Sequence, residues 1–362
     1  MRVAVLGAGA GGAAMASELC LKGHVVAFWG RGQETLAPFQ QRGGVGYEGV
    51  LGSGVARPAL ITKDLSHALR DAEVAIVALP TFSHAVMARA VASSKWPEDR
   101  PILLNPGHTG GALEFSEAYR ASGGAVPPIV EFSTLTYVAR KYHPDCVTIT
   151  SRAKCVRAAA LPGGTAALHL ASKLFPSASP VADVLAADLS NVNMILHPPG
   201  AVLAAAWIEA RHGDFTFYVE AMTPGVSRVM QQLDDERRRV AQAFGHNLPN
   251  LVEEMQFIGT VENDISDTND FTAAIRGGKA NQAIRAPDSL GHRYYREDFG
   301  HGLLPFIEFA AIARIEVPVA TALFEIGQAV CGTDFRQSGR TALAMGIAGL
   351  SLKDLMHKVT LQ

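Results

Sequence analysis

The chain has 362 residues, of which 48% are hydrophobic and 18% are charged. This composition is ordinary for a soluble globular protein with a large core, and the length is sufficient for two domains. The 32 basic and 34 acidic side chains give a formal net charge of −2. A chain so close to neutral has no overall basic field to attract nucleic acid or an anionic membrane, and we expect neither as a partner.

Three features lead us to expect a cytoplasmic protein. The stretch 191–208 carries no formal charge, but its two prolines and its polar residues argue against a membrane span. Residues 1–16 combine one arginine with an apolar run, as signal peptides do, yet their many glycines fit a strand and a phosphate-binding loop better. Four cysteines lack the spacing of metal ligands, so we expect reduced thiols and no metal: Cys20, Cys146, Cys155 and Cys331.

The chain opens with the pattern of a β–α–β unit. An apolar run predicts a buried strand over Arg2–Leu6, a helix is predicted over Gly12–Leu21, and a second strand over His24–Trp29. Three glycines spaced G-x-G-x-x-G lie between the first strand and the helix. In this setting they form the dinucleotide-binding fingerprint, which is far more specific than the same glycines without a strand and a helix around them.

Each glycine of this turn has a predicted role. Gly7 permits the tight turn, Gly9 lets the backbone approach a pyrophosphate, and Gly12 lets helix and strand pack closely. Ala10 and Gly11 complete the turn at the start of the helix, where unpaired N–H groups and a partial positive charge attract phosphate. A glycine-rich turn without a ligand is the alternative that the residues leave open.

The end of the second strand bears on the choice of coenzyme. An acidic residue about 20 residues after the glycines usually binds the ribose 2′-hydroxyl of NAD. Here that position holds Gly30, which brings no carboxylate near a 2′-phosphate, and Arg31 offers a guanidinium suited to binding one. We therefore expect NADP(H) in preference to NAD(H). NAD(H) would be favoured if Glu34 reached the ribose, and Arg31 would then be only a surface charge.

Strands and helices alternate through the rest of the first half. Continuous apolar runs are typical of a parallel sheet covered on both faces. They predict strands over Glu73–Leu79, Pro101–Asn105, Ile129–Phe132, Cys146–Thr150 and Cys155–Ala160, and helices are predicted over Ser83–Ser93 and Gly111–Ala121. Ligands bind such sheets at the carboxyl ends of the strands. Pro80, Thr81 and Asn105 are therefore candidates for lining the coenzyme site, although ordinary turn chemistry explains each of them equally well.

From about residue 185 apolar residues recur at helical spacing instead. The predicted helices cover Val184–Leu196, Gly200–Ala210, Val226–Phe244, Leu248–Ile258, Leu304–Ala313, Pro318–Val330 and Leu350–Val359. The fold class expected is α/β, with a Rossmann doubly wound parallel sheet over residues 1–184 followed by an all-α domain over residues 185–362. The apolar helices of the second domain form either its core or the interface of a homodimer.

Two segments of the second domain carry groups suited to catalysis. Pro198 disfavours helix at His197, so we expect this histidine at an irregular junction between two apolar helices. It either ends a helix by bonding a nearby carbonyl or has a functional role. Arg293 and Glu297 would be an ordinary ion pair four residues apart on a helix surface. Segment 215–220 either packs in the core or shapes a substrate pocket.

Several long motifs in a fixed order give the chain a resemblance that no single motif would carry. Besides the N-terminal glycines, they are Leu104–Phe115, Asn191–Pro198, Tyr218–Pro224, Arg293–Asp298 and Asp334–Thr341. With them the chain resembles the opine dehydrogenase family of the octopine/nopaline type over essentially its whole length. It is most similar to the bacterial members that make N-(1-carboxyalkyl) amino acids.

The resemblance implies a reaction and three site residues. Members of the family join an α-keto acid to the amino group of an L-amino acid and reduce the resulting imine, with substrates bound between a Rossmann domain and a helical domain. The family's catalytic histidine falls on His197, its carboxylate partner on Asp298, and its substrate-carboxylate arginine on Arg293. Some relatives carry an acidic residue where this chain has Gly30 and Arg31, so their coenzyme preference does not transfer.

Two other functions fit parts of the sequence. The first is an NADP-dependent reductase of 2-keto or 3-hydroxy acids on the same two-domain plan, which needs no amine. Such enzymes often use a lysine in the first long helix of the second domain, and residues 182–208 contain none. The second is a non-enzymatic NADP-binding sensor, which would keep the glycine turn but has no use for His197, Arg293 and Asp298.

Overall fold

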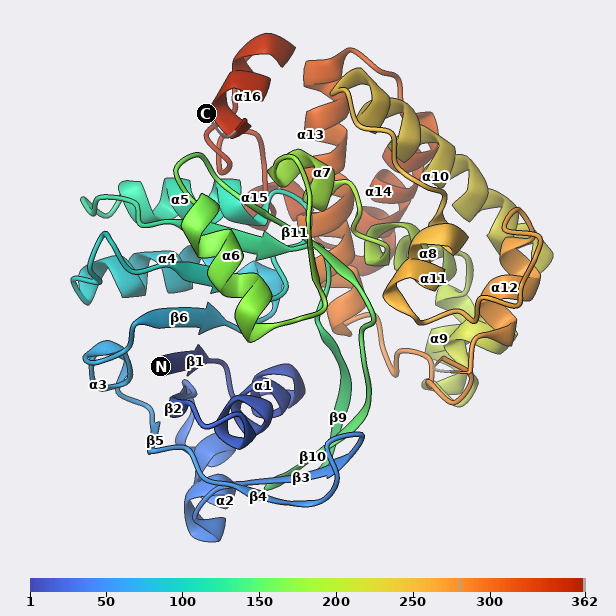
Figure 1. The fold of residues 1–362 in the computed structure, drawn as a ribbon. Helices are drawn as coiled ribbons and strands as arrows, with labels where there is room; N and C mark the ends of the chain where they lie inside the picture. Colours follow the sequence, from blue (N-terminus) through green and yellow to red (C-terminus); the bar gives the residue numbers. More distant parts are fainter. Residues whose placement is uncertain (280, 361–362) are drawn as a thin grey trace. The chain divides into compact units, whose positions relative to one another are not determined.

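A computed structural model describes residues 1–279 and 281–360, which form two compact units (Figure 1). Unit 1 contains residues 1–107 and 111–184 together with Thr360, and unit 2 contains His108–Gly110 and Leu185–Val359. Unit 1 holds the strands and unit 2 is helical, so the predicted fold class is confirmed. None of the helices in these residues combines the length and the apolar character that crossing a bilayer requires.

The N-terminal strand is an interior strand of the larger sheet of unit 1. Among the described residues eight strands are ordered β12-β11-β8-β7-β6-β1-β2-β5. Their bounds are β1 (Arg2–Leu6), β2 (Val25–Trp29), β5 (Leu60–Thr62), β6 (Val74–Val77), β7 (Ile102–Leu104), β8 (Ile129–Phe132), β11 (Val156–Ala160) and β12 (Ala178–Pro180). Because β2 and β6 pair with opposite edges of β1, the strand order reverses there. Ligands bind α/β sheets at such a reversal, beyond the carboxyl ends of the strands.

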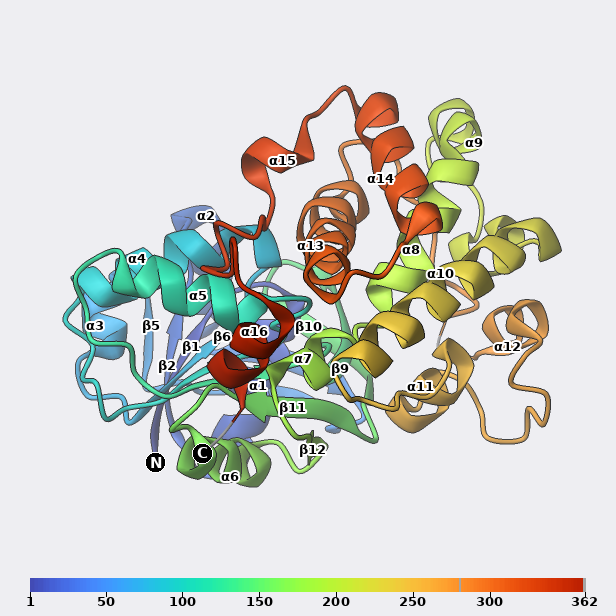
Figure 2. The ribbon, with the colours of Figure 1, turned by 90° about the horizontal axis from the view of Figure 1, so that it is seen from above.

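Helices connect these strands, as the sequence predicts. They are α1 (Ala10–Leu21), α2 (Gln33–Arg42), α3 (Leu65–Leu69), α4 (His84–Ser93), α5 (Gly111–Arg120) and α6 (Thr165–Leu174), with a 3₁₀ turn η1 (Thr81–Ser83) before α4. Helices α4 and α5 lie side by side (Figure 2). The predicted strands and helices up to residue 132 agree with the observed ones to within about two residues at each end. Elements α2, α3, α6, β5 and β12 have no counterpart among the predictions.

A second, smaller sheet corrects one prediction. Its order is β4-β3-β10-β9, with β3 (Val45–Gly49), β4 (Gly54–Ala56), β9 (Tyr137–His143) and β10 (Cys146–Arg152), and the four strands lie together in Figure 1. The placement of Cys146–Thr150 in the main parallel sheet is therefore wrong. A tight turn joins β9 to β10, and strands joined so closely pair antiparallel. Strand β11 is also antiparallel to its neighbour β8, which corrects the parallel pairing expected for Cys155–Ala160.

Unit 2 consists of helices of two kinds. The α-helices are α7 (Val184–Asp188, whose first residue belongs to unit 1), α8 (Asn193–Leu203), α9 (Ala205–Arg211), α10 (Pro224–Ala243), α11 (Leu251–Ile258), α12 (Phe271–Gly277), α13 (Leu304–Ala313), α14 (Pro318–Cys331), α15 (Phe335–Ser338) and α16 (Leu352–Val359). The π-helices are η2 (Phe217–Ala221) and η3 (Tyr295–Leu303). Helix α8 packs against α10, α14 and η3, which makes it the centre of the unit.

Helix α8 corrects the interpretation of the prolines. It runs without a break through Pro198 and Pro199, so the predicted junction at His197 is wrong, and the break falls earlier, between Asp188 and Asn193. Proline removes one N–H group and crowds the preceding turn. Here nine consecutive residues, 194–202, are buried. Packing on all sides thus outweighs the local preference, as tertiary context often does.

Candidate functional site

The three glycines of the turn in unit 1 have two different explanations: the fold requires Gly7 and Gly12, whereas only a ligand would require Gly9. Gly7 has φ +137°, and a Cβ there would lie 2.3 Å from the carbonyl oxygen of Ala78. A Cβ on Gly12 would lie 1.8 Å from the carbonyl oxygen of Gly7. Both glycines are therefore required by the protein itself. Gly9 has φ −77° and no atom within 4 Å of a Cβ, so nothing in the fold demands glycine there, whereas close approach of a ligand would.

The start of helix α1 presents donors beside this open glycine. The helix begins at Ala10 with Gly9 as its N-cap, and no side chain caps it. The N–H groups of Ala10, Gly11 and Gly12 belong to the first turn, which has no intrahelical acceptors for them. Together with the helix dipole they suit a phosphate group. The turn therefore fits the pyrophosphate of a dinucleotide.

The other coenzyme candidates of unit 1 have contacts of their own. A Cβ on Gly30 would lie 2.8 Å from that of Ala8, so packing alone accounts for this glycine, while Arg31 is exposed. Pro80 and the buried Thr81 form the turn after β6. The Asn105 side chain donates to Thr136 Oγ1 at 3.0 Å and accepts from its N–H at 3.2 Å, and thus ties the end of β7 to the start of β9.

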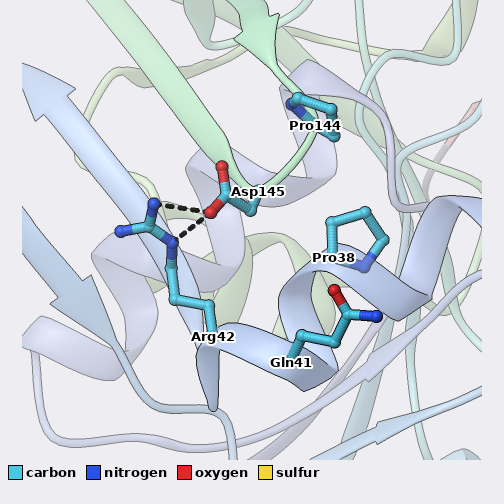
Figure 3. A pocket seen from close by; sticks show the side chains of 5 residues that line it. All are labelled: Pro38, Gln41, Arg42, Pro144 and Asp145. Atoms are coloured by element: carbon cyan, nitrogen blue, oxygen red, sulfur yellow. Dashed lines mark hydrogen bonds and ion pairs between the residues drawn. The ribbon is translucent and has the colours of Figure 1, made fainter.

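A surface hollow of unit 1 is a weaker candidate for a site (Figure 3). It lies at the C-terminal end of α2, and its lining residues are Pro38, Gln41, Arg42, Pro144 and Asp145. Arg42 Nε donates to Asp145 Oδ2 at 2.6 Å, so the charged groups of this hollow neutralise each other. It includes none of the predicted site residues.

Unit 2 brings His197, Asp298 and Arg293 into one cluster. His197 lies on α8 with its Nδ1 2.7 Å from Asp298 Oδ2 on η3, and both side chains are at most 5% exposed. This histidine therefore does not end a helix, as one reading of the sequence had it. A carboxylate on one ring nitrogen fixes the tautomer and stabilises the imidazolium, which prepares the other nitrogen for proton transfer.

Two tyrosines that the sequence did not single out complete the surroundings of this histidine. The hydroxyl of Tyr218, on η2, lies 2.7 Å from His197 Nε2. The ring of Tyr294 stacks on the imidazole with centroids 3.7 Å apart and an interplanar angle of 14°. Tyr218 and Asp298 both lie on π-helices, which are rare and often occur at functional sites. Gly200 leaves η2 room beside α8, since a Cβ there would lie 2.9 Å from Phe217.

Arg293 stands at the exposed side of the cluster. Its side chain is 54% exposed and its Nη1 lies 3.5 Å from Glu297 Oε2. The expected ion pair four residues apart is therefore present, but it is not the ordinary surface pair expected, because the Glu297 side chain is only 5% exposed. Its guanidinium carbon also lies 5.8 Å from the centre of the Tyr294 ring, the same ring that stacks on His197. An arginine held on one side and open on the other can still bind a carboxylate with its planar fork.

Burial governs the charges of the cluster. It raises the pKa of Asp298 well above the ordinary value, and the neighbouring Glu297 adds to this effect. It likewise raises the pKa of Tyr218, whose hydroxyl therefore keeps its proton near neutral pH. Such perturbed groups, gathered at one place, are typical of functional sites.

A second histidine, His108, lies within electrostatic range of the same carboxylates. Burial lowers its pKa, while Glu297 and Asp298 act in the opposite direction. His108 has φ +58°, a conformation that is uncommon for a residue other than glycine. Next to it, the Gly110 N–H donates to Asp188 Oδ1 at 2.7 Å, and Asn191 Nδ2 donates to Thr109 Oγ1 at 3.1 Å. The motif around residue 108 is thus joined to the motif around residue 191 within unit 2.

Comparison with protein families matches both halves of the chain. The alpha-helical domain of NAD/NADP octopine/nopaline dehydrogenase matches residues 180–331, and ketopantoate reductase PanE/ApbA matches residues 3–104. The chain is 34% identical to an opine dehydrogenase of Arthrobacter sp. (strain 1C), with 98% of each chain covered. It is 24% identical to the vitopine synthase of Allorhizobium ampelinum, with 96% of each covered.

Solved structures show the same fold. Octopine dehydrogenase with NADH and L-arginine superposes with a TM-score of 0.78 at 20% identity, covering 98% of both chains. Yersinopine dehydrogenase with NADP⁺ bound superposes with a TM-score of 0.76 at 15% identity, covering 99% of this chain and 97% of the other. The predicted resemblance is thereby confirmed. The chain belongs to the opine dehydrogenase family of NAD(P)-dependent oxidoreductases.

Proposed function

We propose that the chain condenses the amino group of an L-amino acid with an α-keto acid and reduces the imine, giving an N-(carboxyalkyl) amino acid. The observation that carries this proposal is the 2.7 Å contact of His197 with Asp298, beside the open guanidinium of Arg293. These groups supply proton transfer and carboxylate binding, the two demands that the coenzyme does not meet. Family membership supports the same reaction.

Each unit would contribute one part of this reaction. We assign coenzyme binding to a domain over residues 1–184 and substrate binding to a domain over residues 185–362, with His108–Gly110 contributed to the second by a loop of the first. The turn from Gly7 to Gly12 would hold the pyrophosphate, with its backbone free to approach at Gly9. Pro80, Thr81 and Asn105 would shape the carboxyl edge of the sheet. When bound, NAD(P)H supplies the hydride that reduces the imine carbon.

Arg293 is expected to hold the carboxylate of the keto acid and so orient its carbonyl carbon. Arg293→Lys keeps the charge but loses the bidentate fork. A hydrogen bond to a charged group contributes about 1.5–3 kcal/mol. The Michaelis constant for the keto acid should therefore rise about tenfold or more, while that for the coenzyme stays unchanged. Initial-rate kinetics measure both, with Arg238→Lys on an exposed face of α10 as the control. Unaltered use of the keto acid would remove Arg293 from this role.

Arg31 is expected to make NADPH the preferred coenzyme. It lies between the end of β2 and the first turn of α2, which is where the 2′-phosphate of NADPH would bind. Arg31→Ala should raise the Michaelis constant for NADPH about tenfold and that for NADH much less, because only the former carries the extra phosphate. Steady-state kinetics with both coenzymes test this. Equal changes for the two coenzymes would rule out the assignment.

The proposed substrates can be identified by a pairwise screen. Amino acids are combined with pyruvate, glyoxylate, oxaloacetate and 2-oxoglutarate in the presence of each coenzyme, and products are read by mass spectrometry. We expect one or a few pairs to yield a secondary amine that carries both carbon skeletons. A screen in which no pair yields such an amine, with the protein folded and the coenzyme bound, would contradict the proposal.

A further inference from the structure

The imidazole of His197 has a partner at each of its two nitrogens. Asp298 contacts Nδ1 and the hydroxyl of Tyr218 contacts Nε2, both at 2.7 Å. The nitrogen opposite the carboxylate is the one that would exchange a proton with a substrate. Since the histidine is only 4% exposed, the group that this nitrogen meets first is the Tyr218 hydroxyl.

We propose that Tyr218 transfers the proton between His197 and the substrate, as the outer member of a relay that runs from Asp298 through His197. The inference rests on the proposed function, because it adds a partner to the histidine of that reaction. It makes the phenolic O–H of Tyr218 the group that touches the carbinolamine formed from the keto acid and the amine.

The relay explains how the carbinolamine loses water to form the iminium. The Tyr218 hydroxyl donates its proton to the hydroxyl oxygen of the carbinolamine, and the C–O bond breaks with its electron pair on the departing water. The nitrogen lone pair of the substrate forms the C=N bond of the iminium. The Tyr218 oxygen takes a proton from Nε2 of the His197 imidazolium, which becomes neutral. The imidazole regains a proton from the next amino acid, whose ammonium group must lose one before its amine can attack.

The surroundings of Tyr218 suit this role. Its ring packs edge-on against Phe217 with centroids 5.3 Å apart, which fixes the direction of the hydroxyl. Tyr294 stacks on the imidazole with centroids 3.7 Å apart, and so holds the His197 ring in place beside the Tyr218 hydroxyl. Burial keeps the phenol protonated, as a proton donor requires.

Removal of one hydroxyl tests the relay, and the chain offers a matched control. Tyr218→Phe should lower kcat roughly 10²–10³-fold, the lower part of the range for a positioned acid. The Michaelis constants should change little. The control is Tyr295→Phe, which removes another buried hydroxyl of the same unit, one that bonds the Ala201 carbonyl at 2.9 Å. It should keep kcat near the wild-type value, while thermal melting shows that both variants fold.

A double mutant shows whether the two side chains act as one. If Tyr218 works through His197, the variant carrying both His197→Ala and Tyr218→Phe should be no slower than His197→Ala alone. The relay is overturned if Tyr218→Phe keeps or exceeds the wild-type kcat, because the tyrosine would then only cover Nε2 and move aside. It is equally overturned if the two losses multiply. A His197→Ala variant with near-normal turnover would remove the histidine, and the relay with it, from the chemistry, whereas the proposed function itself fails only if no substrate pair yields a secondary amine.

Discussion

Replacing His197 with alanine is expected to lower kcat roughly 10²–10⁴-fold, the range that one general acid or base contributes. A histidine imidazole has an ordinary pKa of about 6.5, which lets it both give and take a proton near neutral pH. Coenzyme affinity should be unchanged, because the glycine turn that would bind the coenzyme belongs to the other unit. Stopped-flow or steady-state turnover, together with coenzyme titration, measures the two effects separately.

The control for this variant is a histidine outside the cluster. His169 lies exposed on α6, so His169→Ala should retain wild-type turnover and coenzyme affinity. If His197→Ala were to turn over at nearly the wild-type rate, the histidine would have no part in the chemistry. A loss of coenzyme affinity equal to the loss of rate would show a structural effect rather than a catalytic one.

Asp298→Asn is expected to lower kcat by roughly 10² or more, since an amide cannot stabilise the imidazolium and does not fix the required tautomer. The substitution keeps the shape of the side chain, which is 2% exposed and 2.7 Å from His197. The control is Asp235→Asn. Asp235 is exposed and pairs with Arg238, so this substitution should have no effect on turnover. Near-normal turnover of Asp298→Asn would exclude the carboxylate from the mechanism.

The same variant carries a prediction about stability. The pKa of Asp298 lies well above the ordinary value because the carboxyl group is buried and next to Glu297. Its contribution to stability is therefore fully present below about pH 4, the ordinary pKa of aspartate, and is lost as the pH rises through the raised native value. Asparagine does not titrate. Thermal melts from acidic to neutral pH should thus show that the difference in Tm, variant minus wild type, increases as the pH rises. A difference that decreases with pH would contradict the raised pKa.

The first half of the fold follows from local sequence patterns. Strand β1 over Arg2–Leu6 and strand β8 over Ile129–Phe132 have the predicted bounds, because continuous apolar runs between glycines and prolines have few other solutions. Strands β3 and β4 escaped prediction because they are short, partly exposed and rich in glycine. Strand β4 pairs with β3, and β3 in turn pairs with β10, about 100 residues later in the chain, which no local pattern reveals.

The site was predictable only in part. His197 and Asp298 are 101 positions apart in the sequence, and only the family resemblance connected them before the fold was known. Tyr218 lies in a motif noted in the sequence, but core packing explains a tyrosine in that segment more readily. The π-helices that aim Tyr218 and Asp298 at the imidazole have no simple periodicity, so their directions come from packing against α8. The prolines of α8 led to a wrong helix boundary, because the local preference of proline for a helix end is outweighed here by burial of the helix on all sides.

The most direct test of the central claim is the dependence of coenzyme oxidation on an amine. NADPH or NADH is mixed with the protein and a keto acid, with and without an amino acid, and the product is identified by mass. We predict rapid oxidation only when both substrates are present, and a product whose mass is the sum of the two less water plus two hydrogens. Equally rapid oxidation with the keto acid alone, giving the corresponding hydroxy acid, would contradict the account.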